Sequence, residues 1–269
     1  MTKGMIFCGC SFTWGQGLYY YSKMETLKAP PPFEFIPSYV TDAHKNYMCA
    51  NRFARLVANH FNTFEILKSS NYGCDEQSLT FLDIIFDRNN NHEFNYTFER
   101  YDYSEVGYVI FQTSSFIRNG FKFKIDGVDY FTNLTRDKKD LIDKLILELG
   151  FSNIDELYDH FIKDYFNQIK NKFIELEANG VKCTILCWFD DYIKYIEPDE
   201  YMNSRFIRLI YDNKEFNTID ELMKYDHNMN IKDDHEFFGN KTPDDSHPSM
   251  KCHKVIADSI IKKLENETI

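Results

Sequence analysis

Short apolar runs alternate with amphipathic segments along the chain, and this alternation predicts a sheet covered by helices. Short runs rich in apolar residues, typical of strands, begin at Met5, Phe64, Val106 and Val181. Apolar residues spaced three and four apart predict helices over residues 48–60, 76–86, about 152–178 and 252–264. Strands that alternate with helices favour a single α/β domain with a central parallel sheet of about five strands.

Two stretches interrupt this alternation and are expected to be insertions on that one domain, which spans residues 1–269. The first covers 117–150 and holds "FKFKIDGVDYF", in which Asp126-Gly127 predicts a tight hairpin turn. The second covers 200–240, with a strand pair and a short helix expected over 206–225 and a polar loop from Asp226 onwards.

Local signals place several boundaries. Residues 19–47 are expected to be irregular, because the three prolines of residues 30–32 bar a helix or a central strand. Ser152 to Asp155 form a plausible capping box that opens the long helix, and Asn179-Gly180 is typical of its end.

Composition and charge exclude several classes of function. The formal net charge is −11, which argues against nucleic acid and anionic membrane surfaces as partners, since both need a basic face. No apolar run reaches the length of a membrane-spanning helix, and the first residues do not resemble an export signal. The seven cysteines have no zinc-finger spacing, so we expect reduced thiols, a cytoplasmic location, no metal and no cofactor.

Four short segments directly follow predicted strands. These segments are Ser11, Asn71-Tyr72-Gly73, Gln112-Thr113-Ser114 and Trp188. Because parallel strands place their ligand crevice at their carboxyl ends, we expect these four segments to meet at one rim of the sheet.

Residues that could react at this rim stand near the end of the chain, in "PDDSHPS". Asp244 lies three residues before His247, so one loop can present an imidazole and a carboxylate to the same point. A serine hydroxyl needs a base to remove its proton, and a carboxylate on the far ring nitrogen orients that base. Ser11, His247 and Asp244 are therefore candidates for a nucleophile, its base and the orienting acid.

The blocks "GCSFTWGQGL", "NYGCDEQS" and "DDSHPS" resemble, in this order, those of the SGNH hydrolases, also called the GDSL-type esterase/lipase superfamily. The resemblance implies a flavodoxin-like fold of three layers, α, β and α. It also implies that Ser11 is the nucleophile, His247 the general base and Asp244 its orienting acid. The backbone N–H groups of Ser11 and Gly73 would then contribute to an oxyanion hole.

The chain departs from this family at two places. Cys10 stands where the first block usually has Asp, and the third strand ends in "FQTSSFIR" without the usual Asn side chain of the oxyanion hole. Counting from the strand end puts Ser114 at that position. The candidate substrate-binding residues around the rim are Trp14, Gln112, Thr113, Arg118 and Trp188.

Each of these residues also has a structural interpretation. A serine after a glycine is often only a turn residue, each tryptophan is about as frequently part of a core, and His253 is interpreted as packing or surface. The expected function is hydrolysis of a small acyl ester, such as an acetyl group on a carbohydrate, so the expected partner is a small-molecule or carbohydrate ester. The alternatives are a non-catalytic binding module and an acyltransferase that uses the same triad.

Overall fold

Four parallel strands form the sheet at the centre of the described part of the chain, which covers residues 3–15, 17–27, 42–67, 74–86, 99–125, 127–240, 242 and 245–267. The structure is a computed structural model. In spatial order, the strands are β2 (Glu65–Leu67), β1 (Gly4–Cys8), β3 (Val106–Gln112) and β6 (Lys182–Leu186). Beyond β6, two isolated parallel bridges continue the edge, from Ile185 to Phe206 and from Cys187 to Thr218.

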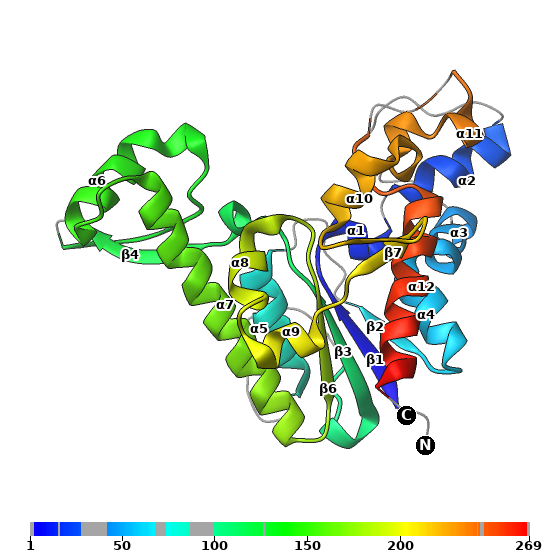
Figure 1. Ribbon diagram of the computed structural model, residues 1–269, viewed down its shortest axis with the longest axis horizontal. Helices are drawn as coiled ribbons and strands as arrows, with labels where there is room; N and C mark the ends of the chain where they lie inside the picture. Colours follow the sequence, from blue (N-terminus) through cyan, green and yellow to red (C-terminus); the bar gives the residue numbers. More distant parts are fainter. Residues whose placement is uncertain are drawn as a thin grey trace.

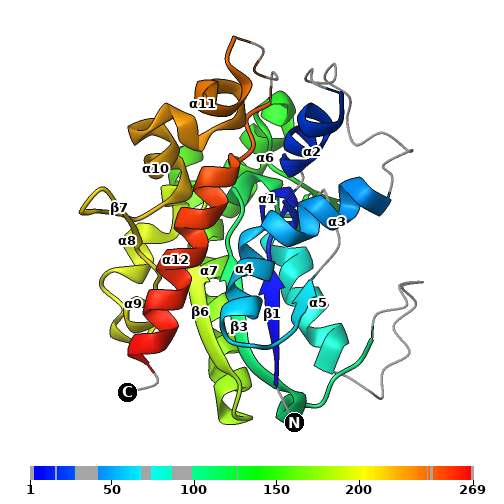
Figure 2. The same cartoon turned by 90° about the vertical axis from the view of Figure 1, so that its right-hand side faces the viewer.

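Helices cover both faces of this sheet, as the alternation of the sequence predicts. Successive side chains of β1 point to opposite faces, so Ile6 packs in one core and Phe7 in the other. The first core lies against α5 (Asp75–Phe86) and α7 (Ile154–Ala178), and the second against α4 (Phe53–His60) and α12 (Met250–Asn266). Figures 1 and 2 show these layers, with α12 and α4 in front of the sheet in Figure 2. The predicted three-layer α/β fold is confirmed, with four strands in the described sheet where about five were expected.

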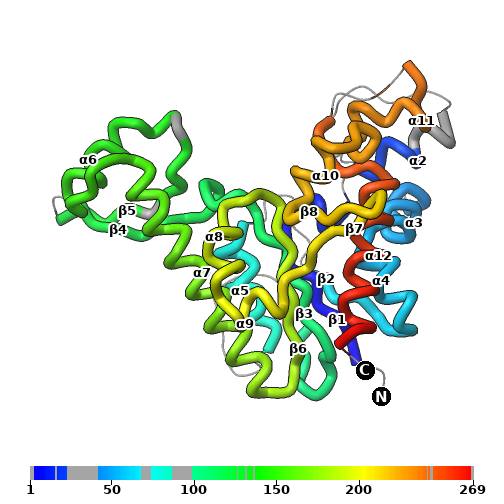
Figure 3. Tube along the Cα trace, viewed as in Figure 1, coloured from blue at the N-terminus to red at the C-terminus, as the bar shows by residue number. Residues whose placement is uncertain are grey.

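The remaining elements lie mostly above the carboxyl ends of the strands or beside the sheet (Figures 1 and 3). The helices are α1 (Ser11–Trp14), α2 (Leu18–Leu27), α3 (Asp42–Asn51), α6 (Lys139–Leu149), α8 (Ile193–Ile196), α9 (Glu200–Arg205), α10 (Ile219–Tyr225) and α11 (His235–Phe238). The short 3₁₀ turns are η1 (Tyr103–Glu105), η2 (Phe116–Arg118), η3 (Arg136–Lys138), η4 (Asp190–Tyr192), η5 (His227–Met229) and η6 (Ile231–Asp233). None of the helices in the described ranges has the length and apolarity needed to cross a bilayer.

Both predicted strand pairs are present. β4 (Phe121–Ile125) and β5 (Val128–Thr132) pair antiparallel around Gly127, whose φ of +79° fits the turn that the sequence predicts. Together with α6 they lie at the far end of α7, away from the sheet (Figure 1). The second pair, β7 (Leu209–Tyr211) and β8 (Lys214–Phe216), precedes α10 as expected.

The expectation of an irregular segment over 19–47 is wrong for its two ends. α2 extends to Leu27 and α3 begins at Asp42, while the prolines of residues 30–32 lie outside the described residues. The side chains of Tyr19, Tyr20 and Tyr21 are buried against Met48, Ile231 and Phe238. Burial of these rings stabilises α2, a helix that the sequence pattern of this stretch does not predict.

The predicted helix over 48–60 is two helices, α3 and α4, that meet at Arg52. Arg52 has extended backbone angles, and its buried guanidinium donates to both carboxylate oxygens of Glu65 at 3.1 and 2.6 Å. It also lies 4.9 Å from the centre of the Trp14 ring. The capping box expected over Ser152 to Asp155 does not open α7. Its N-cap is Asn153, which accepts a hydrogen bond from the N–H of Glu156.

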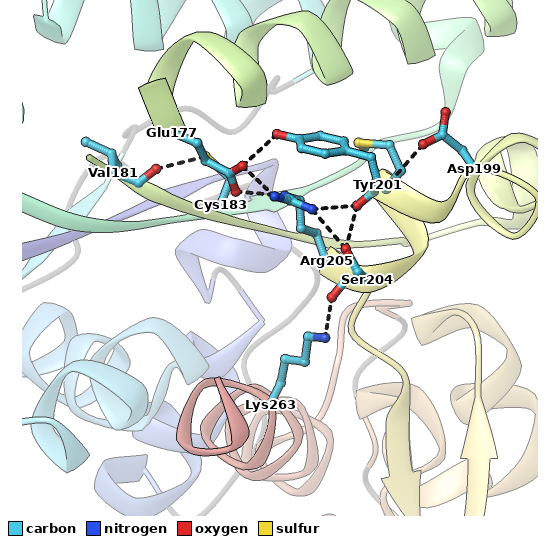
Figure 4. A network of polar contacts seen from close by, with 9 residues as sticks. Glu177, Val181, Cys183, Asp199, Tyr201, Ser204, Arg205 and Lys263 are labelled. Carbon is cyan, nitrogen blue, oxygen red and sulfur yellow. Dashed lines mark hydrogen bonds and ion pairs between the residues drawn. The ribbon is translucent and has the colours of Figure 1, made fainter. Parts of the chain in front are cut away.

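A polar network joins α7, α9 and α12 near the amino end of β6 (Figure 4). Arg205 donates to the two carboxylate oxygens of Glu177 at 2.7 and 2.5 Å and lies over the ring of Tyr201. Tyr201 donates to the same carboxylate, and Lys263 of α12 donates to the Ser204 carbonyl. Two-point pairing of this kind fixes geometry more firmly than a single surface ion pair.

His253 belongs to the core, as the sequence interpretation of packing allows. It lies on α12 with no exposed surface, and its Nδ1 accepts the N–H of Phe53 at 3.3 Å. Burial is the main cause that lowers the pKa of His253 to about 3, and the proximity of His247 and Arg52 lowers it further. The imidazole is therefore neutral in the folded protein.

We expect His253 to make the fold sensitive to acid. Its pKa in the unfolded chain is about 6.5. Below that pH, the unfolded chain binds a proton at this residue that the folded chain does not bind. His253→Asn, which keeps an acceptor for Phe53, should reduce the loss of unfolding free energy between pH 7.5 and 5.0 by about 2 kcal/mol. Urea unfolding at both pH values measures this, with exposed His60→Asn as the control, and an unchanged loss would contradict it.

Candidate active site

Ser11 stands at the carboxyl end of β1, as the first residue of α1. β1 is fully buried, and the chain turns through Gly9 and Cys10 before α1 begins. A Cβ on Gly9 would lie 2.1 Å from the Thr13 hydroxyl, so only glycine lets α1 fold back this closely onto the strand end. Ser11 itself is 6% exposed. The turn therefore holds a hydroxyl close to the rim in a fixed direction.

His247 faces this hydroxyl from the other end of the chain. Its Nε2 lies 3.1 Å from Ser11 Oγ, and its Nδ1 is hydrogen-bonded to the Asp245 carboxylate. When Nδ1 donates its proton to the carboxylate, the neutral imidazole has a free Nε2 that can accept the proton of Ser11. The three side chains thus form one continuous relay of hydrogen bonds, the arrangement that activates a serine hydroxyl.

The carboxylate that contacts the imidazole is that of Asp245. Asp244, the acid expected from the sequence, lies outside the described residues. The spacing gives the physical reason. Asp245 stands two residues before His247, and its Oδ1 also accepts the backbone N–H of His247 at 3.0 Å. A side chain that closes a turn onto the N–H two residues ahead is a common role of Asp, and it brings the carboxylate beside the ring.

Main-chain hydrogen bonds hold the loop of His247 against residues 229–232. These bonds are Ile231 N to His247 O at 3.0 Å, Lys232 N to Asp245 O at 3.1 Å and Ser249 N to Met229 O at 2.8 Å. The Ser249 side chain then caps α12 by accepting the N–H of Cys252 at 3.2 Å. Part of the expected insertion over 200–240 therefore positions the imidazole.

Aromatic and close backbone packing limit the His247 ring further. The ring of Phe12 lies 4.7 Å from that of His247 and stacks on Trp188 with 3.5 Å between centres. On another side stands Gly17, where a Cβ would lie 2.6 Å from His247 Cβ and 2.2 Å from the Ile231 side chain. No larger residue fits at Gly17 without displacing the imidazole.

Gln112 supports the serine turn from the neighbouring strand. The register pairs Cys8 with Phe111, so Gln112 comes beside the turn. Its side-chain oxygen accepts the Thr13 hydroxyl at 2.7 Å, and its amide nitrogen lies 3.3 Å from Cys10 Sγ. Burial raises the pKa of the Cys10 thiol, which is therefore neutral. Gln112 is thus engaged in the scaffold of Ser11.

The other predicted rim residues lie in different surroundings. Thr113 and Trp188 are buried, Trp14 is half-buried beneath the Arg52 guanidinium, and Arg118 is exposed. Ser114 is buried, with its N–H donated to Asp75 and no hydrogen-bond partner for its hydroxyl in the described part of the chain. Gly73, expected in the oxyanion hole, lies outside the described residues.

Sequence reasoning missed four residues of the site: Phe12, Gly17, Asp75 and Asp245. Asp245 stands directly after Asp244, the acid expected from the sequence. Phe12 and Gly17 stand inside the "GCSFTWGQGL" block. Asp75 follows the predicted glycine of the oxyanion hole by two residues and had no motif of its own. The described residues contain no group of His, Cys, Asp or Glu arranged to hold a metal ion.

Comparisons with known proteins give little beyond this geometry. No protein-family profile and no curated protein matches the sequence. Among solved structures, the chain is similar to a carbohydrate esterase whose active site is described as displaying "divergent catalytic and non-catalytic binding functions". The identity is 13% and the TM-score 0.43, with 98% of this chain and 68% of that chain covered. At these values the similarity carries no argument about the site, which depends on the chain's own contacts.

The close packing at Gly17 has a measurable consequence. Gly17→Ala should displace His247 and lower the rate at which a fluorophosphonate labels Ser11 by roughly 10- to 100-fold, because small misplacements of a reacting group are costly. Gly107→Ala is the matched control, since a Cβ there meets its first neighbour at an ordinary 3.4 Å. Equal labelling rates for the two variants, with equal circular dichroism, would show that Gly17 does not set the position of the imidazole.

Proposed function

We propose that the protein is a serine hydrolase of the SGNH type that cleaves a small acyl ester through an acyl-enzyme on Ser11. The observation that carries the proposal is the relay from Ser11 through His247 to Asp245 at the carboxyl end of the sheet. The order of the blocks along the chain supports the same class. The spacing of Asp245 and His247 departs from the Asp-x-x-His of the family, while the roles of the two side chains stay the same.

The reaction follows from the positions of these groups. The Ser11 oxygen attacks the ester carbonyl carbon while its proton passes to His247 Nε2. Asp245 stabilises the imidazolium that forms. When the tetrahedral intermediate collapses, the bond to the alcohol breaks and His247 returns the proton to the leaving oxygen. Water then attacks the acyl-enzyme, with His247 again as the base, and releases the acid and free Ser11.

The negative oxygen of the intermediate needs hydrogen-bond donors. The family resemblance assigns this role to the N–H groups of Ser11 and Gly73. At Ser114 the N–H is already donated to Asp75, so only the hydroxyl of Ser114 is available to replace the missing Asn. A donor of this kind is worth about 3 kcal/mol in the transition state. An acetyl group on a carbohydrate is the substrate class that we propose.

Replacing the nucleophile tests the proposal directly. Ser11→Ala should leave the circular dichroism unchanged and lower the turnover of p-nitrophenyl acetate by roughly 10⁴- to 10⁶-fold. A fluorophosphonate probe should label the wild-type chain at Ser11 and leave the variant unlabelled. Undiminished hydrolysis by a folded Ser11→Ala protein would refute the assignment.

Paired variants of the two neighbouring aspartates test the relay. Asp245→Asn should lower kcat by roughly 10³- to 10⁴-fold, because the amide no longer holds the required tautomer of His247. Asp244→Asn should change kcat by less than about threefold, because the carboxylate that contacts His247 is that of Asp245. The reverse pattern, measured with the same ester, would return the orienting role to Asp244.

A non-catalytic binding module is the second candidate, and the missing Asn of the third block favours it. The probe separates the two, because an unactivated serine is not labelled. Transfer of the acyl group to an acceptor other than water would use the same triad, and product analysis with a candidate acceptor distinguishes it from hydrolysis.

A further inference from the structure

Asp75 is a buried carboxylate at the rim that the proposed reaction does not yet use. It is the first residue of α5 and has no exposed surface. Its Oδ1 accepts the N–H of Ser114 at 2.7 Å, and its Oδ2 accepts the Tyr192 hydroxyl at 2.7 Å and the Asn119 amide at 3.3 Å. A carboxylate is tolerated in such surroundings only when hydrogen bonds replace its lost water.

The partners of Asp75 come from different strand ends. Ser114 and Asn119 belong to residues 113–120, which follow β3, and Tyr192 belongs to η4, which follows β6. Asn119 returns the contact, since its side-chain oxygen accepts the N–H of Asp75 at 2.8 Å. One carboxylate thus joins the start of α5 to the carboxyl ends of two neighbouring strands.

Two further acids hold the same loop, residues 113–120. The N–H of Phe116 donates to Asp191 at 3.2 Å, and the N–H of Gly120 donates to Glu76 at 3.1 Å. Three backbone N–H groups of one short loop therefore donate hydrogen bonds to three carboxylates, which belong to α5 and η4. Asp75 differs from the other two because its amide partner is Ser114, the one of the three that stands nearest in sequence to the end of β3.

Ser114 and Ser11 stand beyond the carboxyl ends of two neighbouring strands, β3 and β1. Cys8 pairs with Phe111, and each serine stands three residues beyond its member of this pair. Gln112, the last residue of β3, contacts Cys10 and Thr13 on either side of Ser11. Because Asp75 takes the Ser114 N–H, it determines how the loop presents the Ser114 hydroxyl, which is buried without a partner in the described residues.

We infer that Asp75 is a positioning residue for the reaction at Ser11: it holds residues 113–120 so that the Ser114 hydroxyl serves the oxyanion. This inference rests on the proposed esterase function. Burial raises the pKa of Asp75 to about 6, against the lowering effect of its three donors. The carboxylate is thus mainly ionised at neutral pH and able to accept all three hydrogen bonds.

A double-mutant cycle tests the inference. Asp75→Ala should lower kcat for p-nitrophenyl acetate by roughly 100-fold with KM changed less than about threefold, because the lost interaction acts in the transition state. Ser114→Ala, which keeps the backbone N–H, should cause a similar loss. In the Ser114→Ala background the Asp75 substitution should then add little, because both changes remove one coupled unit.

Controls separate this role from a merely structural one. Asp199→Asn is matched, since Asp199 also accepts a backbone N–H at a helix start, that of Met202 in α9, and it should lower stability without lowering kcat. If Asp75→Ala does not fold, Asp75→Asn replaces it. The Asn oxygen can still accept the Ser114 N–H, so we expect a loss of roughly tenfold that again disappears in the Ser114→Ala background.

The outcomes distinguish the inference from the function on which it rests. A wild-type chain labelled at Ser11, together with an Asp75 effect that is equally large with and without the Ser114 hydroxyl, overturns the role of Asp75 alone. So does an unchanged kcat in a folded Asp75 variant. A wild-type chain that is neither labelled nor more active than Ser11→Ala overturns the esterase function and the role of Asp75 together.

Discussion

The hydrogen bond between Ser11 Oγ and His247 Nε2 is the contact on which the site depends, and it joins residues that are 236 positions apart. Neither residue reaches the other by local structure. Ser11 is carried by a buried strand and the turn behind it. His247 is carried by a loop without regular structure, whose position comes from the backbone bonds to residues 229–232. Residues 229–232 therefore help to position His247, although they lie outside the sheet.

Acidic residues at this rim work as acceptors for backbone amides. The chain carries 42 acidic against 31 basic residues, an excess that would be expected to face solvent. At the strand ends, however, Asp75, Asp191 and Glu76 accept N–H groups of one loop, and Asp245 accepts the N–H of His247. Irregular backbone has no neighbouring strand to satisfy its amides, and side-chain carboxylates take that place.

The sequence predicted those parts of the molecule whose physical cause is local. β1, β3 and β6 are apolar on both faces because both faces are covered, and that leaves a clear signal in composition. Ser11 and His247 could be named because each stands in a short motif with a chemical reason. The choice between Asp244 and Asp245 depended on which carboxylate closes a turn, which spacing alone does not decide. α2 exists because its tyrosines meet residues far away in sequence, and the bond of Asp75 to Ser114 likewise depends on tertiary structure.

The tight surroundings of His247 bear on how quickly any chemistry at Ser11 can begin. Phe12, the backbone at Gly17 and the carboxylate of Asp245 confine the ring from different sides. The rotational freedom of the imidazole is thus given up when the chain folds, before any ligand arrives. In the proposed reaction, the imidazole would therefore need little reorganisation energy when a substrate binds. The binding energy of the substrate would then remain available for selectivity.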